Sequence, residues 1–202
     1  MSKRSWIIIA LVAVIGLAVG VAVFWREGGP QAGVAGSSGQ AKVGGPFELV
    51  NQDGQPVDES LLKGKWSVVF FGFTYCPDIC PSTLQAVAVA EEQLGPQADD
   101  LQTVFISVDP ERDTPEQLKT YLSLDAFPDK VIGLTGTPEQ VEKAAKAYYV
   151  YYRKNGEGPD YSVDHSTAAY LMDPEGRFNR VLAYGLPPEE MARLIREAMQ
   201  QG

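Results

Sequence analysis

Cysteine and histidine are scarce in this sequence. Its 202 residues include two cysteines, Cys76 and Cys80, and a single histidine, His165. Two cysteines are too few for a disulfide-stabilised scaffold, and a chain of this length does not need one. The cysteine pair therefore has another use or is incidental, and any role of the histidine can be tested by one substitution.

Basic residues are also in short supply. The chain has 17 Lys and Arg against 26 Asp and Glu, for a formal net charge of −9. Binding to phosphate groups needs a basic face, so this balance argues against nucleic acid as a partner. A solvated acidic surface that keeps the domain soluble is the simplest interpretation, and the charge also permits a cationic partner or metal.

The only long hydrophobic run lies at the N-terminus, where Trp6 to Trp25 is 20 residues without a charge. At ~1.5 Å per residue, a helix of this length spans the ~30 Å core of a bilayer. Lys3 and Arg4 precede the run, and the positive-inside rule then places the N-terminus in the cytoplasm. We expect residues 1–25 to be a single-pass membrane anchor, although a cleaved signal peptide would export the chain equally.

The rest of the chain divides into two parts. Residues 26–45 are rich in Gly, Ser and Ala and predict a flexible linker. Residues 46–202 have the composition of one globular domain. With the anchor in a bacterial inner membrane, this domain would lie on the periplasmic or extracytoplasmic side.

Hydrophobic periodicity predicts the elements of the domain. Trp66 to Phe73 is a nearly continuous apolar run, typical of a central buried strand. Further strands are expected at 47–50, 101–108, 131–134, 168–172 and 178–183, an extended segment at 148–152, and helices at 81–94, 114–124, 138–147 and 188–199. This order predicts an α/β fold with a thioredoxin-like mixed sheet flanked by helices.

The cysteine pair follows the central strand directly, in the sequence FTYCPDICP. Open α/β sheets place their sites at this end of their strands. On a first helical turn, residues four apart share one face, with ~5–6 Å between their Cβ atoms, and helix amides favour thiolates. Three interpretations remain open: a local disulfide or incidental pair, a thiol–disulfide oxidoreductase, and a soft-metal site. The usual redox spacing is Cys-x-x-Cys, and this pair has one more residue between its cysteines.

The metal interpretation requires a third ligand. Two thiolates favour Cu(I) or zinc, and two ligands are too few for structural zinc. His165 follows a polar loop at 153–159 and precedes the predicted hairpin, a position that approaches the cysteine loop in a thioredoxin-like fold. His165 can therefore complete a site with two cysteines, and the alternative is a histidine in a surface loop.

Several neighbouring residues have two interpretations. Asp164 could orient the imidazole, although its backbone neighbours point elsewhere. Asp109 is either a charged residue near the loop that carries the cysteines, or in contact with a partner, or it is a turn and helix-cap residue. Four tyrosines at 148, 149, 151 and 152 are expected to pack on a strand and line its edge, rather than to form a cofactor site.

Four stretches together resemble the Sco/SenC family of copper chaperones. They are FGFTYCPDICP at 71–81, SVDPERDTP at 107–115, YSVDHS at 161–166 and YLMDPEG at 170–176. The resemblance covers the chain from about residue 45 to its end. It implies a thioredoxin fold that holds copper, as Cu(I) with Cu(II) as a further option, on Cys76, Cys80 and His165.

The resemblance also implies partners. A Sco/SenC protein would pass copper to the dinuclear copper centre of cytochrome c oxidase subunit II, with another copper chaperone as a donor. The alternative is a thiol–disulfide reductase that uses Cys76 and Cys80 to keep the cysteines of subunit II reduced. A third possible function is that of a redox-sensing thioredoxin relative. The family likeness does not choose between copper delivery and thiol reduction.

Overall fold

The computed structural model describes residues 43–201. The predicted anchor at 1–25 and most of the predicted linker lie outside these residues. No helix within 43–201 is both long enough and apolar enough to cross a membrane. The elements are β1 (Glu48–Asn51), β2 (Pro56–Asp58), η1 (Glu59–Leu62), β3 (Trp66–Gly72), α2 (Ile79–Leu94), η2 (Gly95–Asp100), β4 (Leu101–Ser107), α3 (Pro115–Leu122), β5 (Val131–Thr135), α4 (Pro138–Ala147), β6 (Tyr152–Asn155), β7 (Ser162–His165), β8 (Ala169–Met172), β9 (Phe178–Leu182) and α5 (Pro188–Gln201).

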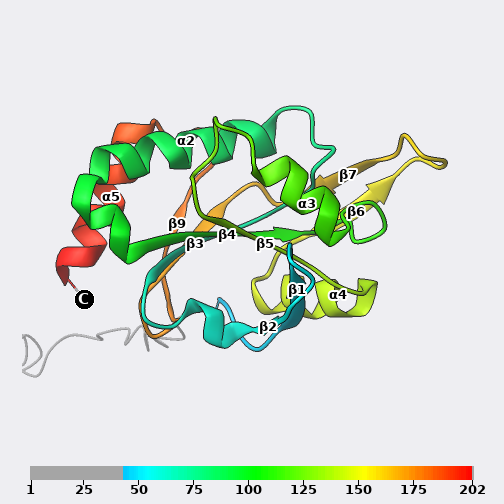
Figure 1. Ribbon diagram of the computed structural model, residues 1–202, viewed down its shortest axis with the longest axis horizontal. Coiled ribbons are helices and arrows are strands. Elements are labelled where there is room, and N and C mark those ends of the chain that lie inside the picture. Colours follow the sequence, from blue (N-terminus) through cyan, green and yellow to red (C-terminus); the bar gives the residue numbers. More distant parts are fainter. Residues whose placement is uncertain (1–42, 202) are drawn as a thin grey trace, which may run out of the picture. The chain divides into compact units, whose positions relative to one another are not determined.

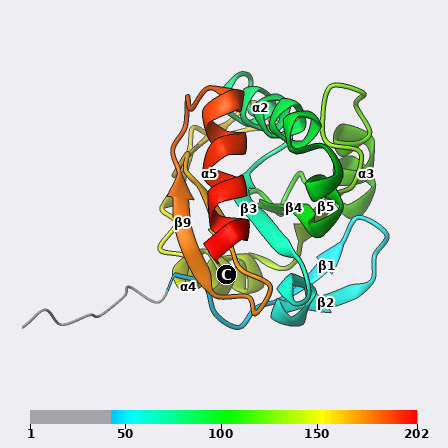
Figure 2. The same ribbon diagram turned by 90° about the vertical axis from the view of Figure 1, so that its left-hand side faces the viewer.

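Seven strands form one mixed sheet in the order β2-β1-β5-β4-β3-β8-β9. The three central strands β3, β4 and β5 are parallel, and β1 and β8 are antiparallel to their neighbours β5 and β3. Helices α2, α3 and α5 cover one face of the sheet and α4 covers the other (Figures 1 and 2). The predicted thioredoxin-like α/β class with a mixed sheet flanked by helices is therefore confirmed.

The central strand β3 is buried along its whole length. Its side chains alternate between the two faces, so Phe70 packs against Phe105 at 5.9 Å between ring centroids while Phe71 packs against Tyr148 at 5.2 Å. Burial of one such side chain contributes about 1.5–3 kcal/mol. Packing on both faces fixes the position of the strand, which ends at Gly72. The segment from Phe73 to Asp78, called the cysteine loop, follows it and leads to α2.

The two predicted helix starts at threonine are present. The hydroxyl of Thr114 accepts a hydrogen bond from the amide of Gln117, and Pro115 occupies the first helical turn. Thr137 and Gln140 form a complete capping box at the start of α4. Each cap satisfies backbone donors that the helix leaves free and contributes about 1 kcal/mol.

The predicted extended segment at 148–152 is wrong. Tyr148 caps the end of α4, where its amide donates to the carbonyl of Ala144, and Tyr149 adopts a left-handed conformation with φ of 56°. A left-handed residue ends a helix, and β6 begins only at Tyr152. Tyr148 is fully buried as expected for packing, whereas Tyr149 and Tyr151 are exposed.

The polar segment expected to be a loop at 153–159 instead begins a hairpin. Strands β6 and β7 pair antiparallel, with Tyr152 opposite His165 and Asn155 opposite Ser162, in a sheet separate from the main one. Residues of these strands are mostly polar and only Val163 is buried, so the apolar–polar alternation that reveals a strand is weak in the sequence. His165 therefore lies at the end of a strand rather than in a loop.

Candidate metal centre

The two cysteines lie on either side of a helix start. Cys76 is in the loop after β3, where its amide donates to the carbonyl of Phe73, and Cys80 is the second residue of α2. The expectation that both share one helical face is wrong, because the helix begins only at Ile79. The turn nevertheless brings the residues together, since the amide of Cys80 donates to Sγ of Cys76 at 3.4 Å.

Cys80 occupies a space that only glycine at position 72 leaves open. The cysteine is fully buried, and a Cβ atom on Gly72 would lie 2.7 Å from its Sγ and 2.9 Å from the ring of Phe105. Real side chains do not approach so closely without a shift of the neighbours. The sequence analysis missed this role of Gly72, although a glycine at the end of a buried strand is a signal of close approach.

His165 reaches the cysteines from the β6–β7 hairpin. Its Nε2 lies 3.5 Å from Sγ of Cys80, and its Nδ1 lies 2.8 Å from the carbonyl oxygen of Ser166. A carbonyl only accepts hydrogen bonds, so Nδ1 carries the proton in the neutral ring and Nε2 presents its lone pair to the sulfur atoms. The ring of Phe73 packs edge-on against the imidazole at 5.7 Å.

The proposed orienting role of Asp164 is wrong. Its carboxylate faces Arg153 at 3.4 Å on the exposed side of the hairpin. The carbonyl of Ser166 holds the imidazole instead, as commonly happens for histidines that bind metals.

The ligand atoms of Cys76, Cys80 and His165 all lie within 4.8 Å of one another. Both cysteines are free thiols, with Cys80 buried and Cys76 partly exposed. Two sulfur atoms and one imidazole nitrogen form a soft donor set that suits Cu(I) better than the hard cations Mg²⁺ or Ca²⁺. The residues that the sequence singled out thus converge in a geometry that fits a soft metal ion.

The two thiols differ in acidity. A hydrogen bond from the Cys80 thiol, with smaller contributions from the amides of Asp78 and Cys80, lowers the pKa of Cys76 to about 3. The same bond to Cys76, together with burial, raises the pKa of Cys80. The expected effect of helix amides on thiol acidity therefore holds for Cys76 and is wrong for Cys80, which keeps its proton and donates it to the Cys76 thiolate.

Alkylation should distinguish the two thiols in the metal-free, reduced chain. We expect iodoacetamide at about pH 6 to modify Cys76 well before Cys80, because the thiolate is the nucleophile. A thiol whose pKa is lowered stays ionised as the pH falls, so the rate at Cys76 should decline only as the pH approaches that pKa. Timed quenching and peptide mass mapping measure both rates, and equal or faster modification of Cys80 would contradict the assignment.

Asp109 is a turn residue, which is one of the two roles considered for it. Its backbone carbonyl accepts from the amides of Arg112 and Asp113 in a turn, as its sequence context suggested. Its buried carboxylate accepts from Nε of Arg112 at 2.6 Å and from the hydroxyl of Tyr161 at 2.5 Å. The carboxylate thus connects the turn after β4 to the hairpin that carries His165.

Asp113 is a supporting residue that the sequence analysis did not single out. Its fully buried carboxylate accepts from the amide and hydroxyl of Thr74 and from the hydroxyl of Ser107. Burial raises the pKa of this carboxyl. Thr74 belongs to the cysteine loop, so Asp113 anchors that loop to the end of β4.

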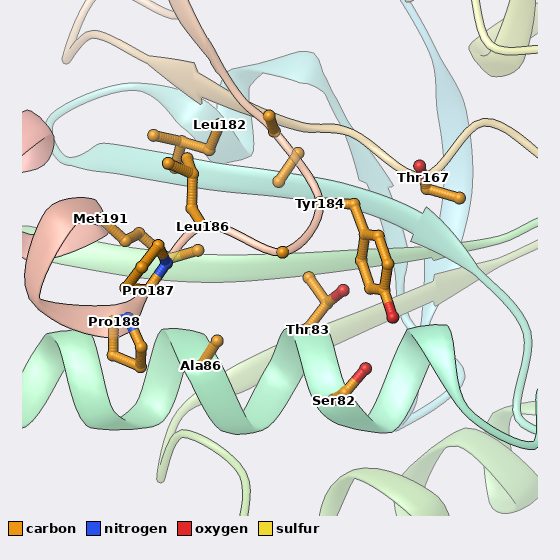
Figure 3. Close-up of a pocket in the computed structure, with 13 residues that line it drawn as sticks. Ser82, Thr83, Ala86, Thr167, Leu182, Tyr184, Leu186, Pro187, Pro188 and Met191 are labelled. Carbon is orange, nitrogen blue, oxygen red and sulfur yellow. The ribbon is translucent and has the colours of Figure 1, made fainter.

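A cavity of about 330 Å³ lies between α2 and the chain after β9 (Figure 3). Ser82 and Thr167, two residues beyond Cys80 and His165, lie at its edge, and Leu186 and Met191 form part of its apolar wall. The buried hydroxyl of Thr83 has no hydrogen-bond partner among residues 43–201. The lining of the cavity is mostly apolar and includes neither cysteine nor His165.

The fold and the site define a thioredoxin-like domain that brings a cysteine pair and a histidine together at the carboxyl end of its central strand. The family model described as SCO1/SenC matches residues 35–200. The chain belongs to this family.

Curated relatives agree with the family assignment. The chain is 49% identical over 144 residues to the mitochondrial SCO1 homolog 1 of Arabidopsis thaliana, covering 70% of this chain and 42% of that protein. It is 40% identical over 186 residues to the protein SenC of the bacterium Rhodobacter capsulatus, covering 91% of this chain and 83% of SenC. The chain thus spans less than half of the Arabidopsis relative and most of the bacterial one.

Solved structures show the same fold. The crystal structure of Arabidopsis thaliana ScoI with copper bound has a TM-score of 0.75 and 42% identity, covering 79% of this chain and 99% of that one. BsSco is a member of the Sco family of cytochrome c oxidase assembly proteins in which a disulfide switch was identified. Its structure has a TM-score of 0.61 and 28% identity, covering 80% of this chain and 95% of that one. Homologous proteins of this fold have therefore been solved with copper.

Proposed function

We propose that this chain is a copper-binding metallochaperone whose ligands are Cys76, Cys80 and His165. The observation that carries the proposal is the convergence of their ligand atoms within 4.8 Å. The copper-bound Arabidopsis structure, at 42% identity, supports copper as the cargo. Cu(I) is the form that two sulfur ligands favour, and Cu(II) is a further oxidation state that the imidazole accommodates.

The differences between the ligands suit uptake and release of the ion. Cys76 is already a thiolate and partly exposed, so it meets the incoming ion first. Cys80 is buried and protonated, so binding of copper releases its proton. Release would proceed by exchange of these ligands for thiolates of a partner, which approaches from the exposed side of Cys76.

The receiving site in this proposal is the dinuclear copper centre of cytochrome c oxidase subunit II, and another copper chaperone acts as donor. The description of BsSco as a member of a family of cytochrome c oxidase assembly proteins supports this destination. Residues 1–25 would anchor the chain in a bacterial inner membrane with the N-terminus in the cytoplasm. Residues 26–45 would serve as linker, and the domain at 46–202 would work on the periplasmic or extracytoplasmic side.

A copper-loading assay tests the ligand set. We expect the reduced chain to bind one copper per molecule and the His165→Ala chain to lose most of it in a competition with a Cu(I) chelator. Loss of one of three ligands should cost more than the roughly 10–100-fold in affinity that is typical for outer-shell partners. Unchanged one-to-one loading of the His165→Ala protein would remove His165 from the ligand set.

Thiol–disulfide reduction is the second candidate, favoured by the low pKa of Cys76 and by the proton held on Cys80. In this reaction, the Cys76 thiolate attacks a disulfide of the target and expels one target thiolate. The Cys80 sulfur then attacks the Cys76 sulfur, gives its proton to a target thiolate and displaces the second target sulfur, leaving a reduced target and a Cys76–Cys80 disulfide. His165→Ala should leave this reaction nearly intact, whereas it should abolish transfer of copper to metal-free subunit II.

A further inference from the structure

The guanidinium of Arg112 lies between the two segments that carry the metal ligands. Arg112 belongs to the turn between β4 and α3, and its Cζ stands 4.6 Å from the ring centroid of Tyr75 and 5.9 Å from that of Phe73. The same atom lies 3.6 Å from the ring of Tyr161. All three distances are within the range of about 6 Å for attraction between a cation and an aromatic face.

Hydrogen bonds fix the guanidinium in this place. Its Nη1 donates to the carbonyls of Pro159 and Tyr161 at 3.2 and 3.0 Å, and its Nε donates to the carboxylate of Asp109 at 2.6 Å. Asp109 also accepts from the Tyr161 hydroxyl, so one carboxylate holds both the guanidinium and the ring stacked on it. The side chain of Arg112 thereby fastens the hairpin to the turn.

The two segments lead directly to the ligands. Tyr75 immediately precedes Cys76, and Tyr161 immediately precedes β7, which ends at His165. Neither segment belongs to the seven-stranded sheet, so its position depends on such side-chain contacts. Arg112 joins the cysteine loop to the histidine strand without touching a ligand.

A general stabilising role explains the arrangement less well. Arg112 is only 14% exposed, and its Nη2 is buried without a hydrogen-bond partner in the described part of the chain. Burying a donor unpaired has a cost, and apolar residues of similar size often stabilise such a position equally well. A planar cation that stacks between rings and donates to two carbonyls is instead suited to hold two segments in register.

We propose that Arg112 is a positioning residue of the metal centre, which sets the cysteine loop against the histidine hairpin. The expected effect of Arg112 on copper affinity rests on the proposed copper-binding function. The positioning role makes a separate statement about the metal-free protein, because none of the contacts of Arg112 involves a ligand side chain.

The first test compares Arg112→Gln and Arg112→Lys in the full chain. Hydrogen–deuterium exchange of the metal-free protein should become faster in peptides covering both 73–76 and 159–165, with unchanged exchange in β3 and β4. Copper affinity, measured by competition with a Cu(I) chelator, should fall roughly 10–100-fold for the Gln variant, as for outer-shell partners of metal ligands. The Lys variant keeps a charge for Asp109 but lacks the planar guanidinium that stacks between the rings and donates in a fixed fork, so it should recover only part of the affinity.

Two further variants test the hairpin and the cysteine loop separately. Lys154 stands 3.9 Å from the Tyr161 ring centroid and pairs with Glu111 at 2.5 Å, so Lys154→Ala should speed exchange in the hairpin alone. Tyr75→Ala should speed exchange in the cysteine loop alone, and Tyr75 is 55% exposed, so its loss leaves folding intact. Arg193→Gln, which breaks exposed ion pairs with Glu190 and Glu197, is the matched control and should change neither measurement.

The outcomes decide between the inferences. Unchanged exchange in both segments and unchanged affinity in a folded Arg112→Gln protein would overturn the positioning role. If that variant does not fold, Tyr75→Ala decides, and wild-type exchange in its cysteine loop with wild-type copper affinity would equally overturn it. If the wild-type chain binds no copper, the proposed function fails, while exchange in the metal-free variants still tests Arg112.

Discussion

Replacing Cys80 with serine should lower the affinity of the chain for Cu(I) by more than about 100-fold, a larger loss than outer-shell changes give. The substitution exchanges a soft sulfur ligand for a hard hydroxyl that Cu(I) does not favour. Cys80 Sγ also lies 3.5 Å from Nε2 of His165, so its removal takes away the sulfur atom in contact with the imidazole. Competition with a Cu(I) chelator under reducing conditions measures the effect.

A second consequence distinguishes this substitution from simple ligand loss. The thiol of Cys80 is the largest single cause of the lowered pKa of Cys76. Serine retains a hydroxyl donor, whereas alanine retains none, so alkylation of Cys76 at acid pH should slow more in Cys80→Ala than in Cys80→Ser. Both variants should lose copper equally.

Ser82→Ala serves as the matched control for these changes. Its hydroxyl lies on the same helix start and donates to the carbonyl of Asp78 at 2.8 Å, without contacting either sulfur atom. We expect wild-type affinity from this variant. Retention of tight copper binding by Cys80→Ser, with Ser82→Ala unchanged, would refute the assigned ligand set.

The sequence allowed prediction of the sheet and its helices because their signals are local. The run from Trp66 to Phe73 is apolar on both faces, and threonine–proline pairs at 114 and 137 start helices by direct hydrogen bonds. The hairpin that carries His165 was missed for the opposite reason. Its strands are polar and are held by contacts such as Arg112 to Tyr161, which no short sequence window reveals.

The metal centre was predictable in composition but not in geometry. Two cysteines and one histidine are easily noticed because the chain has so few of each. Their meeting depends on residues distant in sequence, among them Gly72, which leaves space for the sulfur of Cys80, and the carbonyl of Ser166, which orients the imidazole. Such roles arise from packing between segments, and therefore only the folded chain shows them.

Replacing Asp113 with alanine should produce the largest loss of stability among the substitutions considered, about 3–5 kcal/mol in the free energy of unfolding. The carboxylate is fully buried and accepts from three donors, the amide and hydroxyl of Thr74 and the hydroxyl of Ser107. Alanine leaves these buried or partly buried donors unpaired. Chemical denaturation of the metal-free protein, followed by tryptophan fluorescence and circular dichroism, measures the loss.

The surrounding bonds explain why an amide should restore only part of this stability. Thr74 accepts from Gln117 and Ser107 accepts from the amide of Asp109, so both hydroxyls are set to donate towards Asp113. Asparagine offers one accepting oxygen and one donating nitrogen, which opposes one of those hydroxyls. Asp113→Asn should therefore lie between wild type and Asp113→Ala, whereas the exposed Asp125→Ala should stay within about 0.5 kcal/mol of wild type. Equal stability of Asp113→Ala and Asp125→Ala would show that this network does not hold the cysteine loop in place.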